Sequence, residues 1–433
     1  MMLEFLESEV LPIDRGAVLQ EEIDAACNGT AGGSVLLPRG VTVLSSGLTI
    51  PSYCNVGGHG TGITILRTSG AAGFDVITAG PPTAGAAITL HDFSVDATAF
   101  TSAPHANAAR CVYTKNVRRL TITNVELLHC FTHGIFADDG TAHFTLTNNI
   151  IDTVHVGSGI LVGNTAVERS HQGEAGEVTD GYIGNNEISN THANGIFTLG
   201  SKTYGAFGTA RIAIVGNRIR GANDTAIEIG ESTQDSTCVG NTIVMPELAG
   251  TTGLGIRSTS GVVATGNSIF CTNHSKSGPP GVPGSLGPQV AVIVWSMAVD
   301  NTLSQDTAVS SNVAYDCPLG YITTGPPGSV ISPMIASNSC FRCATPFRHS
   351  GNEVGRMFFL NSDRVIDGNL SLQNVSAARL TCTEGARRGL DVCDIGQSEG
   401  GAEVAQMRSE LQDLKAEVAR LTALVAAGRG IED

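Results

Sequence analysis

The chain has 433 residues, of which 53 are glycine and only 15% are charged, and its formal net charge is −15. This composition is unusual for a helical protein and typical of one built from many strands and tight turns. The acidic charge argues against nucleic-acid binding, which requires clustered Lys and Arg. No apolar run of about 18 residues predicts a membrane span, and the opening MMLEFLESEVLP lacks the basic and apolar regions of a secretory signal.

The segment from Leu19 to Arg67 has a distinctive order of elements. A helix is expected over Leu19 to Cys27, followed by a Gly-rich turn, a strand, a Leu-Pro-Arg-Gly turn and a Gly-His-Gly turn. In this order the segment resembles the opening of the pectate-lyase-like superfamily, which includes many phage tailspikes. The resemblance covers roughly residues 15–385 and implies an all-β right-handed parallel β-helix with a bias toward carbohydrate. The acidic stretch that often precedes this segment is missing, so Met1 to Leu11 is expected to complete a helical cap over residues 1–30.

An internal repeat follows the opening segment. Its markers are asparagines at intervals of 37, 31, 24 and 26 residues, each followed two positions later by isoleucine: Asn149, Asn186, Asn217, Asn241 and Asn267. A period of this length indicates a solenoid, in which equivalent strands of successive coils pair at about 4.8 Å. Asn tolerates left-handed backbone angles, so we expect the markers at the bend between strands. The parallel β-helix is predicted over residues 31–385, and the proline-rich stretch 274–310 is either one coil with a long loop or a break between two halves.

Eleven cysteines are scattered along the chain. Their odd number and irregular spacing argue against a full disulfide framework, so we expect most to be buried thiols packed between coils. Cys340 and Cys343 have the spacing of zinc ligands, but no second close pair accompanies them, and no metal or cofactor is predicted. Cys382 and Cys393 are candidates for one bridge near the end of the body.

The tail differs in composition from the body. Apolar residues recur there in steps of three and four, the pattern of a coiled coil: Val404, Met407, Leu411, Leu414, Val418, Leu421 and Val425. We predict a linker over residues 386–402 and a coiled-coil oligomerisation helix over 403–427, with a lone helix packed on the body as the alternative. Val and Leu at the core positions favour a dimer, whereas the tailspike resemblance implies a homotrimer, which we favour.

Aligned repeats place equivalent residues in rows along the outside of the solenoid. One row brings His155 and His192 to adjacent coils, with Asp224 beside the next, and a histidine beside a carboxylate is a candidate general base. The alternative is a polar ladder of turns. A second row is expected to point outward and either to stack sugar rings or to contact another subunit: Phe136, Leu161, Phe197 and Glu228.

Glycosidases need two carboxyl groups about 5 Å or about 6.5–9.5 Å apart. Asp224, Glu228 and Glu231 share one coil and are the candidate catalytic acids and bases, assisted by His192. Asp139 lies some three coils from Glu228, too far to act with it. The candidate substrate-binding residues are therefore His155, Phe136, Phe197, Asp139 and Arg220. The sharper motifs of polygalacturonases and alginate epimerases are absent.

The sequence thus predicts a tailspike-like glycan depolymerase, a hydrolase or a lyase, that binds an extended polysaccharide and forms a homo-oligomer. The alternative is a non-catalytic viral fibre or capsid-surface protein that serves adhesion or structure. The predicted location is the virion surface, or the extracellular space after non-classical release, because no signal peptide is recognised.

Overall fold

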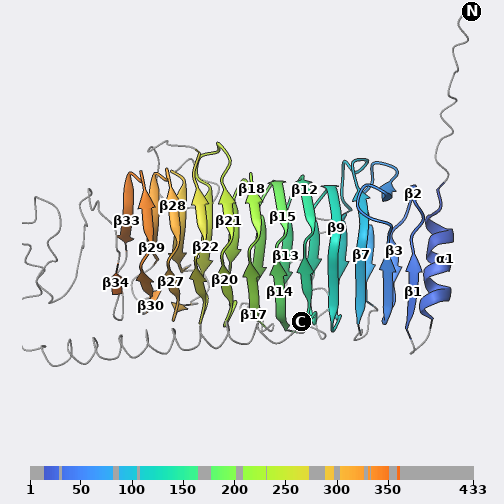
Figure 1. Ribbon diagram of the computed structural model, residues 1–433, viewed down its shortest axis with the longest axis horizontal. Helices are drawn as coiled ribbons and strands as arrows, with labels where there is room; N and C mark the ends of the chain where they lie inside the picture. The colour runs from blue at the N-terminus through green and yellow to red at the C-terminus, as the bar shows by residue number, and fades with distance from the viewer. Residues whose placement is uncertain are drawn as a thin grey trace, which may run out of the picture. The chain divides into compact units, whose positions relative to one another are not determined.

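The computed structural model describes residues 14–28, 32–80, 87–104, 108–163, 177–200, 208–230, 232–272, 288–296, 303–325, 330–331, 333–350 and 358–360. All of them belong to the first of two compact units, Met1–Leu372. They form one helix and a long stack of parallel strands (Figure 1). The predicted linker and coiled coil lie outside these residues.

The helix α1 (Gly16–Cys27) lies at the N-terminal end of the stack, beside β1 (Gly33–Leu36) and β3 (Leu48–Ile50) (Figure 1). It buries one face through residues spaced four apart: Leu19, Ile23 and Cys27. It overlaps the segment in which the sequence predicts a helix, whereas Met1 to Leu11 lies outside the described residues. No helix in the described part of the chain is long and apolar enough to cross a membrane.

The strands form two main sheets, and every pairing is parallel. In the described residues, most coils give two strands to a 21-stranded sheet: β1, β2 (Gly40–Leu44), β4 (Cys54–Gly57), β5 (Thr64–Thr68), β7 (Ile88–Asp96), β9 (Leu120–Cys130), β11 (Thr145–Thr147), β12 (Ile150–Val154), β14 (Val178–Gly184), β15 (Glu187–Thr191), β17 (Thr209–Val215), β18 (Arg218–Arg220), β20 (Thr237–Val239), β21 (Thr242–Val244), β23 (Val263–Thr265), β24 (Ser268–Phe270), β27 (Ala308–Ser310), β28 (Val313–Tyr315), β31 (Met334–Ala336), β32 (Ser339–Phe341) and β34 (Phe358–Leu360).

Each coil gives its third strand to an 11-stranded sheet: β3, β6 (Ile77–Ala79), β8 (Val112–Thr114), β10 (Ile135–Ala137), β13 (Ile160–Gly163), β16 (Ile196–Leu199), β19 (Thr225–Ile229), β22 (Thr252–Arg257), β25 (Val290–Trp295), β29 (Leu319–Thr324) and β33 (Thr345–Ser350). A short pair, β26 (Ser304–Gln305) and β30 (Val330–Ile331), lies apart from both. Because β24 pairs with β28 and β25 joins β22 to β29, the solenoid is continuous across residues 274–310.

The interior is a single apolar core. The isoleucines that open the strands of the smaller sheet are fully buried in it, which confirms that they point inward: Ile135, Ile160, Ile196 and Ile227. Equivalent residues stack on one another because each strand pairs in register with the same strand of the next coil. A coil on its own buries little, so stability comes from the stack.

The bend within each coil corrects one sequence prediction. The left-handed residue is the one before each marker asparagine, as at Asn148 (φ 56°), Asn185 (φ 55°), Gly216 (φ 66°) and Gly240 (φ 65°). The markers themselves are absent from the left-handed residues. The expectation that the marker asparagine supplies the left-handed angle is therefore wrong, because its side chain has a different role.

The marker asparagines point inward and form a hydrogen-bonded ladder. Asn217 Nδ2 donates to Oδ1 of Asn241 at 3.0 Å and to the Ile183 carbonyl at 2.9 Å. The Asn217 Oδ1 accepts from the backbone N–H and the side-chain amide of Asn186, at 3.0 and 2.9 Å. Seven buried asparagines on successive coils take part: Asn149, Asn186, Asn217, Asn241, Asn267, Asn312 and Asn338. The ladder satisfies the polar groups that the bend exposes to the core.

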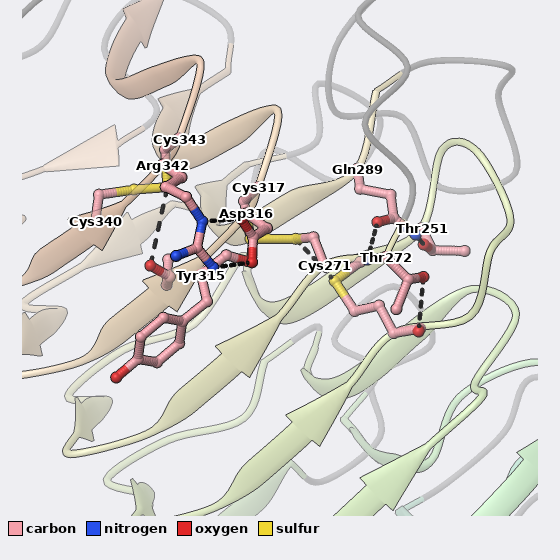
Figure 2. Close-up of a disulfide and its surroundings, with 12 residues drawn as sticks. Thr251, Cys271, Thr272, Gln289, Tyr315, Asp316, Cys317, Cys340, Arg342 and Cys343 are labelled. Atoms are coloured by element: carbon pink, nitrogen blue, oxygen red, sulfur yellow. Dashed lines mark hydrogen bonds and ion pairs between the residues drawn. A yellow bond between two sulfur atoms is a disulfide. The ribbon is translucent and has the colours of Figure 1, made fainter.

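The expectation that most cysteines are buried thiols is wrong. In the described part of the chain only Cys238 is free, and the others form four disulfides: Cys27–Cys54, Cys111–Cys130, Cys271–Cys317 and Cys340–Cys343. Stacking explains the pairing, since it brings Cys271 within 4.9 Å (Cα to Cα) of Cys317, 46 residues later in the sequence (Figure 2). The bond between Cys340 and Cys343 replaces the zinc interpretation. Cys382 and Cys393 lie outside the described residues.

Candidate functional site

The outward row predicted for the smaller sheet exists in the strand register. Phe136 pairs with Leu161, Leu161 with Phe197, and Phe197 with Glu228. Its exposure differs from the expectation, because Phe136, Leu161 and Glu228 are only 0%, 3% and 4% exposed. Only Phe197 keeps a partly exposed ring. The side chains of this row point away from the core, but other side chains cover most of them from solvent.

Neighbouring side chains on the outside of the sheet cover Phe136. Its ring lies 5.7 Å from that of Tyr113 and 5.6 Å from that of His133, measured between ring centroids. The Arg110 guanidinium lies 5.3 Å from the same ring. Phe136 therefore presents no open face on which a sugar ring could stack.

Glu228 lies at the centre of the polar groups on this face. Its Oε2 accepts a hydrogen bond from Asn194 Nδ2 at 2.9 Å, and its Oε1 lies 3.0 Å from Arg257 Nη2. Both contacts favour the charged carboxylate. We call Asn194, Asp224, Glu228 and Arg257 the acid cluster.

Asp224 lies in the turn before β19 in a contrasting environment. It is partly buried, and burial raises the pKa of its carboxyl, while the positive charge of Arg257 acts in the opposite direction. Its Oδ1 is buried and has no hydrogen-bond partner in the described part of the structure. Asp224 and Glu228 therefore lie on one coil in contrasting environments: burial raises the pKa of Asp224, whereas Glu228 has a hydrogen bond from Asn194 and an ion pair with Arg257.

Two glycines make room for Arg257 between aromatic rings. Gly255 follows Glu228 in the row, and a Cβ atom there would lie 2.9 Å from the Trp295 ring. At Gly230 a Cβ atom would lie 2.7 Å from the Phe197 ring. The Arg257 guanidinium lies 5.8 Å from the centre of the Phe197 ring and 5.9 Å from that of Trp295. These contacts hold the guanidinium beside the Glu228 carboxylate, and its charge also acts on Asp224.

The raised pKa of Asp224 predicts a pH-dependent stability change for Asp224→Asn. An acid whose pKa is raised in the folded state destabilises the fold as pH increases past its ordinary value of 3.8, because the folded protein resists ionisation. We expect Asp224→Asn to raise the melting temperature at pH 7 and to leave it unchanged near pH 3. Thermal unfolding followed at both pH values measures this, and equal stability at pH 7 would contradict the buried position of the carboxyl.

The histidines of the other row lie on adjacent coils. The His192 N–H donates to the Val154 carbonyl at 2.9 Å, which brings His192 level with His155. Both side chains are exposed. The His155 ring stacks 6.1 Å from that of His129, and burial and the neighbouring imidazole lower the pKa of His155. His192 lies one coil before Asp224. Its role as a catalytic base is a proposal.

The remaining candidate residues lie apart from the acid cluster. Asp139 follows β10, three coils before β19, and pairs with Lys115 at 3.8 Å. Arg220 is exposed on β18 of the large sheet, whereas Glu228 belongs to the smaller sheet. Glu231 lies outside the described residues. No group of three His, Cys, Asp or Glu side chains in the described segments is arranged to hold a metal ion.

A second polar network, beside β8 and β10, was not anticipated. Arg110 makes two parallel hydrogen bonds to Asp75, at 2.8 and 2.7 Å, and its guanidinium lies 3.5 Å from the centre of the Tyr113 ring. The Tyr113 hydroxyl donates to Asp138 at 2.9 Å. Asp75 and Arg110 stand at equivalent positions of successive coils, three residues before the paired Thr78 and Tyr113. These coils precede the first marker asparagine, so the repeat in the sequence gives no signal for their contact.

Solved structures share this architecture. The A-module of a mannuronan C-5 epimerase from Azotobacter vinelandii has a TM-score of 0.53 and 13% identity over 82% of this chain and 97% of its own. The surface protein and adhesin PfbA of Streptococcus pneumoniae has a TM-score of 0.52 and 14% identity over 80% and 96%. The enzymatically active domain of tailspike protein 2 of bacteriophage CBA120 has a TM-score of 0.52 and 12% identity over 75% of this chain and 45% of its own.

Sequence comparison gives no relative: no protein-family model matches the chain, and no curated protein is significantly similar to it. Structural similarity at this level of identity establishes the fold. The chain has the right-handed parallel β-helix fold that these structures share, which confirms the fold that the resemblance in the sequence implies.

Proposed function

We propose that this protein is a carbohydrate-active β-helix protein that binds an extended polysaccharide and cleaves it at the acid cluster. The observation that carries the proposal is the contrast between Asp224 and Glu228. Asp224, whose pKa is raised by burial, is suited to deliver a proton to the leaving oxygen. Glu228, paired with Arg257, is suited to act as the charged base or nucleophile.

Accessible groups around Asp224 fit a sugar ligand. Phe197 offers a partly exposed aromatic ring, and Arg257, which lies near that ring, supplies a charged donor beside Glu228. Aromatic rings and charged hydrogen-bonding groups together are the usual means of holding a sugar. His192, on the coil before Asp224, and Glu231, which lies outside the described residues, complete the proposed catalytic set.

The proposal extends to location and assembly. Four disulfides are typical of an oxidising environment such as a virion or cell surface, which fits a tailspike-like protein at the virion surface or in the extracellular space. The heptads of residues 403–427 are proposed to join the chains as a homo-oligomer, with a trimer favoured.

The test is incubation of the purified full-length protein with capsular, lipopolysaccharide, plant and algal glycans. New reducing ends report cleavage, and absorbance from unsaturated uronates separates a lyase from a hydrolase. We expect one glycan to yield product and Glu228→Gln to lower the rate by a factor on the order of 1,000 or more. Glu187→Gln, an exposed carboxylate on the large sheet, is the control and should keep full activity.

A non-catalytic adhesion or structural role is the second candidate. The observation in its favour is that Glu228 is 4% exposed and matched by Arg257, the arrangement of a structural ion pair. One structural neighbour is itself described as an adhesin. Retention of a glycan without any product, by the wild type and by Glu228→Gln alike, would favour this role and contradict the catalytic one.

A further inference from the structure

One outer face of the solenoid carries no charge over eight coils. It consists of two neighbouring outward-facing positions on each of eight successive strands: Thr121 and Thr123, Thr145 and Thr147, Tyr182 and Gly184, Ala213 and Val215, Thr237 and Val239, Val263 and Thr265, Ala308 and Ser310, and Met334 and Ala336. The ion pair of Asp180 with Arg211, on β14 and β17, lies at its edge. We call it the neutral face. The residue between the members of each pair is buried in the core, so every pair points outward.

The neutral face differs from an ordinary surface. A surface with about 25–35% charged residues, the range that favours solubility, would have about four to six charged residues among these sixteen positions. The next face of the same coils is charged in its N-terminal half, through Glu126, Asp152, Glu187, Arg218 and Arg220. Apart from Gly184, each residue of the neutral face is partly or fully exposed, so the lack of charge is not a result of burial.

In the C-terminal half the uncharged surface continues around the bend. There β21, β24, β28 and β32 carry no charged residue, and three aromatic rings stack across coils. The centre of the Tyr315 ring lies 4.7 Å from that of Phe270 and 5.2 Å from that of Phe341. Phe270 and Phe341 are 36% and 46% exposed. On the neutral face itself, Val263 is 38% and Met334 is 43% exposed. Exposed Phe, Tyr and Met without charged residues are typical of the core of a protein–protein interface.

We infer that the neutral face binds the same face of other copies of this chain, in parallel and in register. A rotation axis running along the solenoid brings each coil against the same coil of its neighbours, so a residue near the axis meets its own copies. A charged residue there would meet an identical charge at each level, which is unfavourable in a chain with a net charge of −15. The face spans about 34 Å, from seven steps of about 4.8 Å.

A second copy fits this face better than a glycan does. Sugar recognition relies on carboxylates, amides and guanidinium groups, and none of these side chains occurs among the sixteen positions. Small and β-branched residues instead make the face flat, which suits close packing against an identical surface. The inference does not depend on catalysis, because the acid cluster lies on the smaller sheet.

Cysteine cross-linking tests the inference in the full-length protein. Val215→Cys and Val239→Cys lie one coil apart on the neutral face, and Arg218→Cys, exposed just beyond the bend, is the matched control. After mild oxidation, we expect the two valine variants to run largely as covalent dimers on non-reducing gels: about two thirds of the chain if the assembly is a trimer, and nearly all if it is a dimer. Arg218→Cys should match the wild type.

Several results would overturn the inference. Light scattering that gives the mass of a monomer for the wild type would do so, as would equal cross-linking of Val215→Cys and Arg218→Cys in folded protein. A third result would also do so: a variant, Val215→Cys or Val239→Cys, that is monomeric and whose new thiol reacts with maleimide unless a glycan is added. The face would then bind sugar and not a second copy. Circular dichroism of each variant verifies that the fold is retained.

Discussion

Replacing Asn217 with alanine is expected to lower the free energy of unfolding by about 4 kcal/mol. The substitution removes one side chain of the asparagine ladder and leaves three groups without it: the Ile183 carbonyl and the backbone and side-chain N–H groups of Asn186. The Asn241 side-chain oxygen still accepts a hydrogen bond from the backbone N–H of residue 217. All three groups lie in the core, where an unsatisfied polar group costs about 1–3 kcal/mol. Partial relaxation makes the total smaller than the largest sum of three such terms.

Urea unfolding of the full-length protein measures this loss. The matched control is Thr242→Ala, an exposed residue one position beyond the next asparagine of the ladder, which should change stability by less than about 0.5 kcal/mol. A loss below about 1 kcal/mol for Asn217→Ala, with an unchanged slope against urea, would mean that water or neighbouring groups replace the ladder bonds.

The same asparagines show how far the sequence could be interpreted. Their spacing predicts a solenoid because repeats with buried isoleucines two positions later can bury a core only by stacking. Their role was misjudged, since periodicity does not distinguish which of two neighbouring residues takes the left-handed angle. A signal was present: glycine stands immediately before Asn217, Asn241 and Asn267. A glycine in a turn is better suited to a positive φ than the asparagine that follows it.

Contacts between coils were harder to predict than the coils themselves. Cys271 and Cys317 are 46 residues apart, farther than the spacing of the marker asparagines, so composition and spacing give no sign that the two residues stack. The row from Phe136 to Glu228 was aligned correctly, but its burial depends on Arg110 and Arg257, which are offset from it in their own coils, and on Tyr113, which continues the row on the coil before Phe136. The sequence therefore gives the register of the stack, whereas coverage of its outer faces requires side-chain positions.

Replacing Arg257 with methionine is expected to lower the free energy of unfolding by about 3–5 kcal/mol at pH 7. Methionine keeps most of the side-chain volume between Phe197 and Trp295, so the main loss is the cation 3.0 Å from the buried Glu228 carboxylate. The loss requires the carboxylate to be charged, so the difference from the wild type should shrink as the pH is lowered and carboxyl groups take up protons.

A double-mutant cycle separates the ion pair from packing. Glu228→Gln removes the charge, so the variant with both substitutions should be more stable than Arg257→Met alone by about 2 kcal/mol or more. Thermal or urea unfolding of the four proteins at pH 7 and pH 4 gives the coupling energy. If the coupling is near zero at both pH values, Arg257 does not stabilise the charge of Glu228. The opposite protonation states proposed for Asp224 and Glu228 would then lose their physical basis. A large coupling, combined with an active wild type and inactive Glu228→Gln, would mean that the ion pair which stabilises the coil also prepares the carboxylate for catalysis.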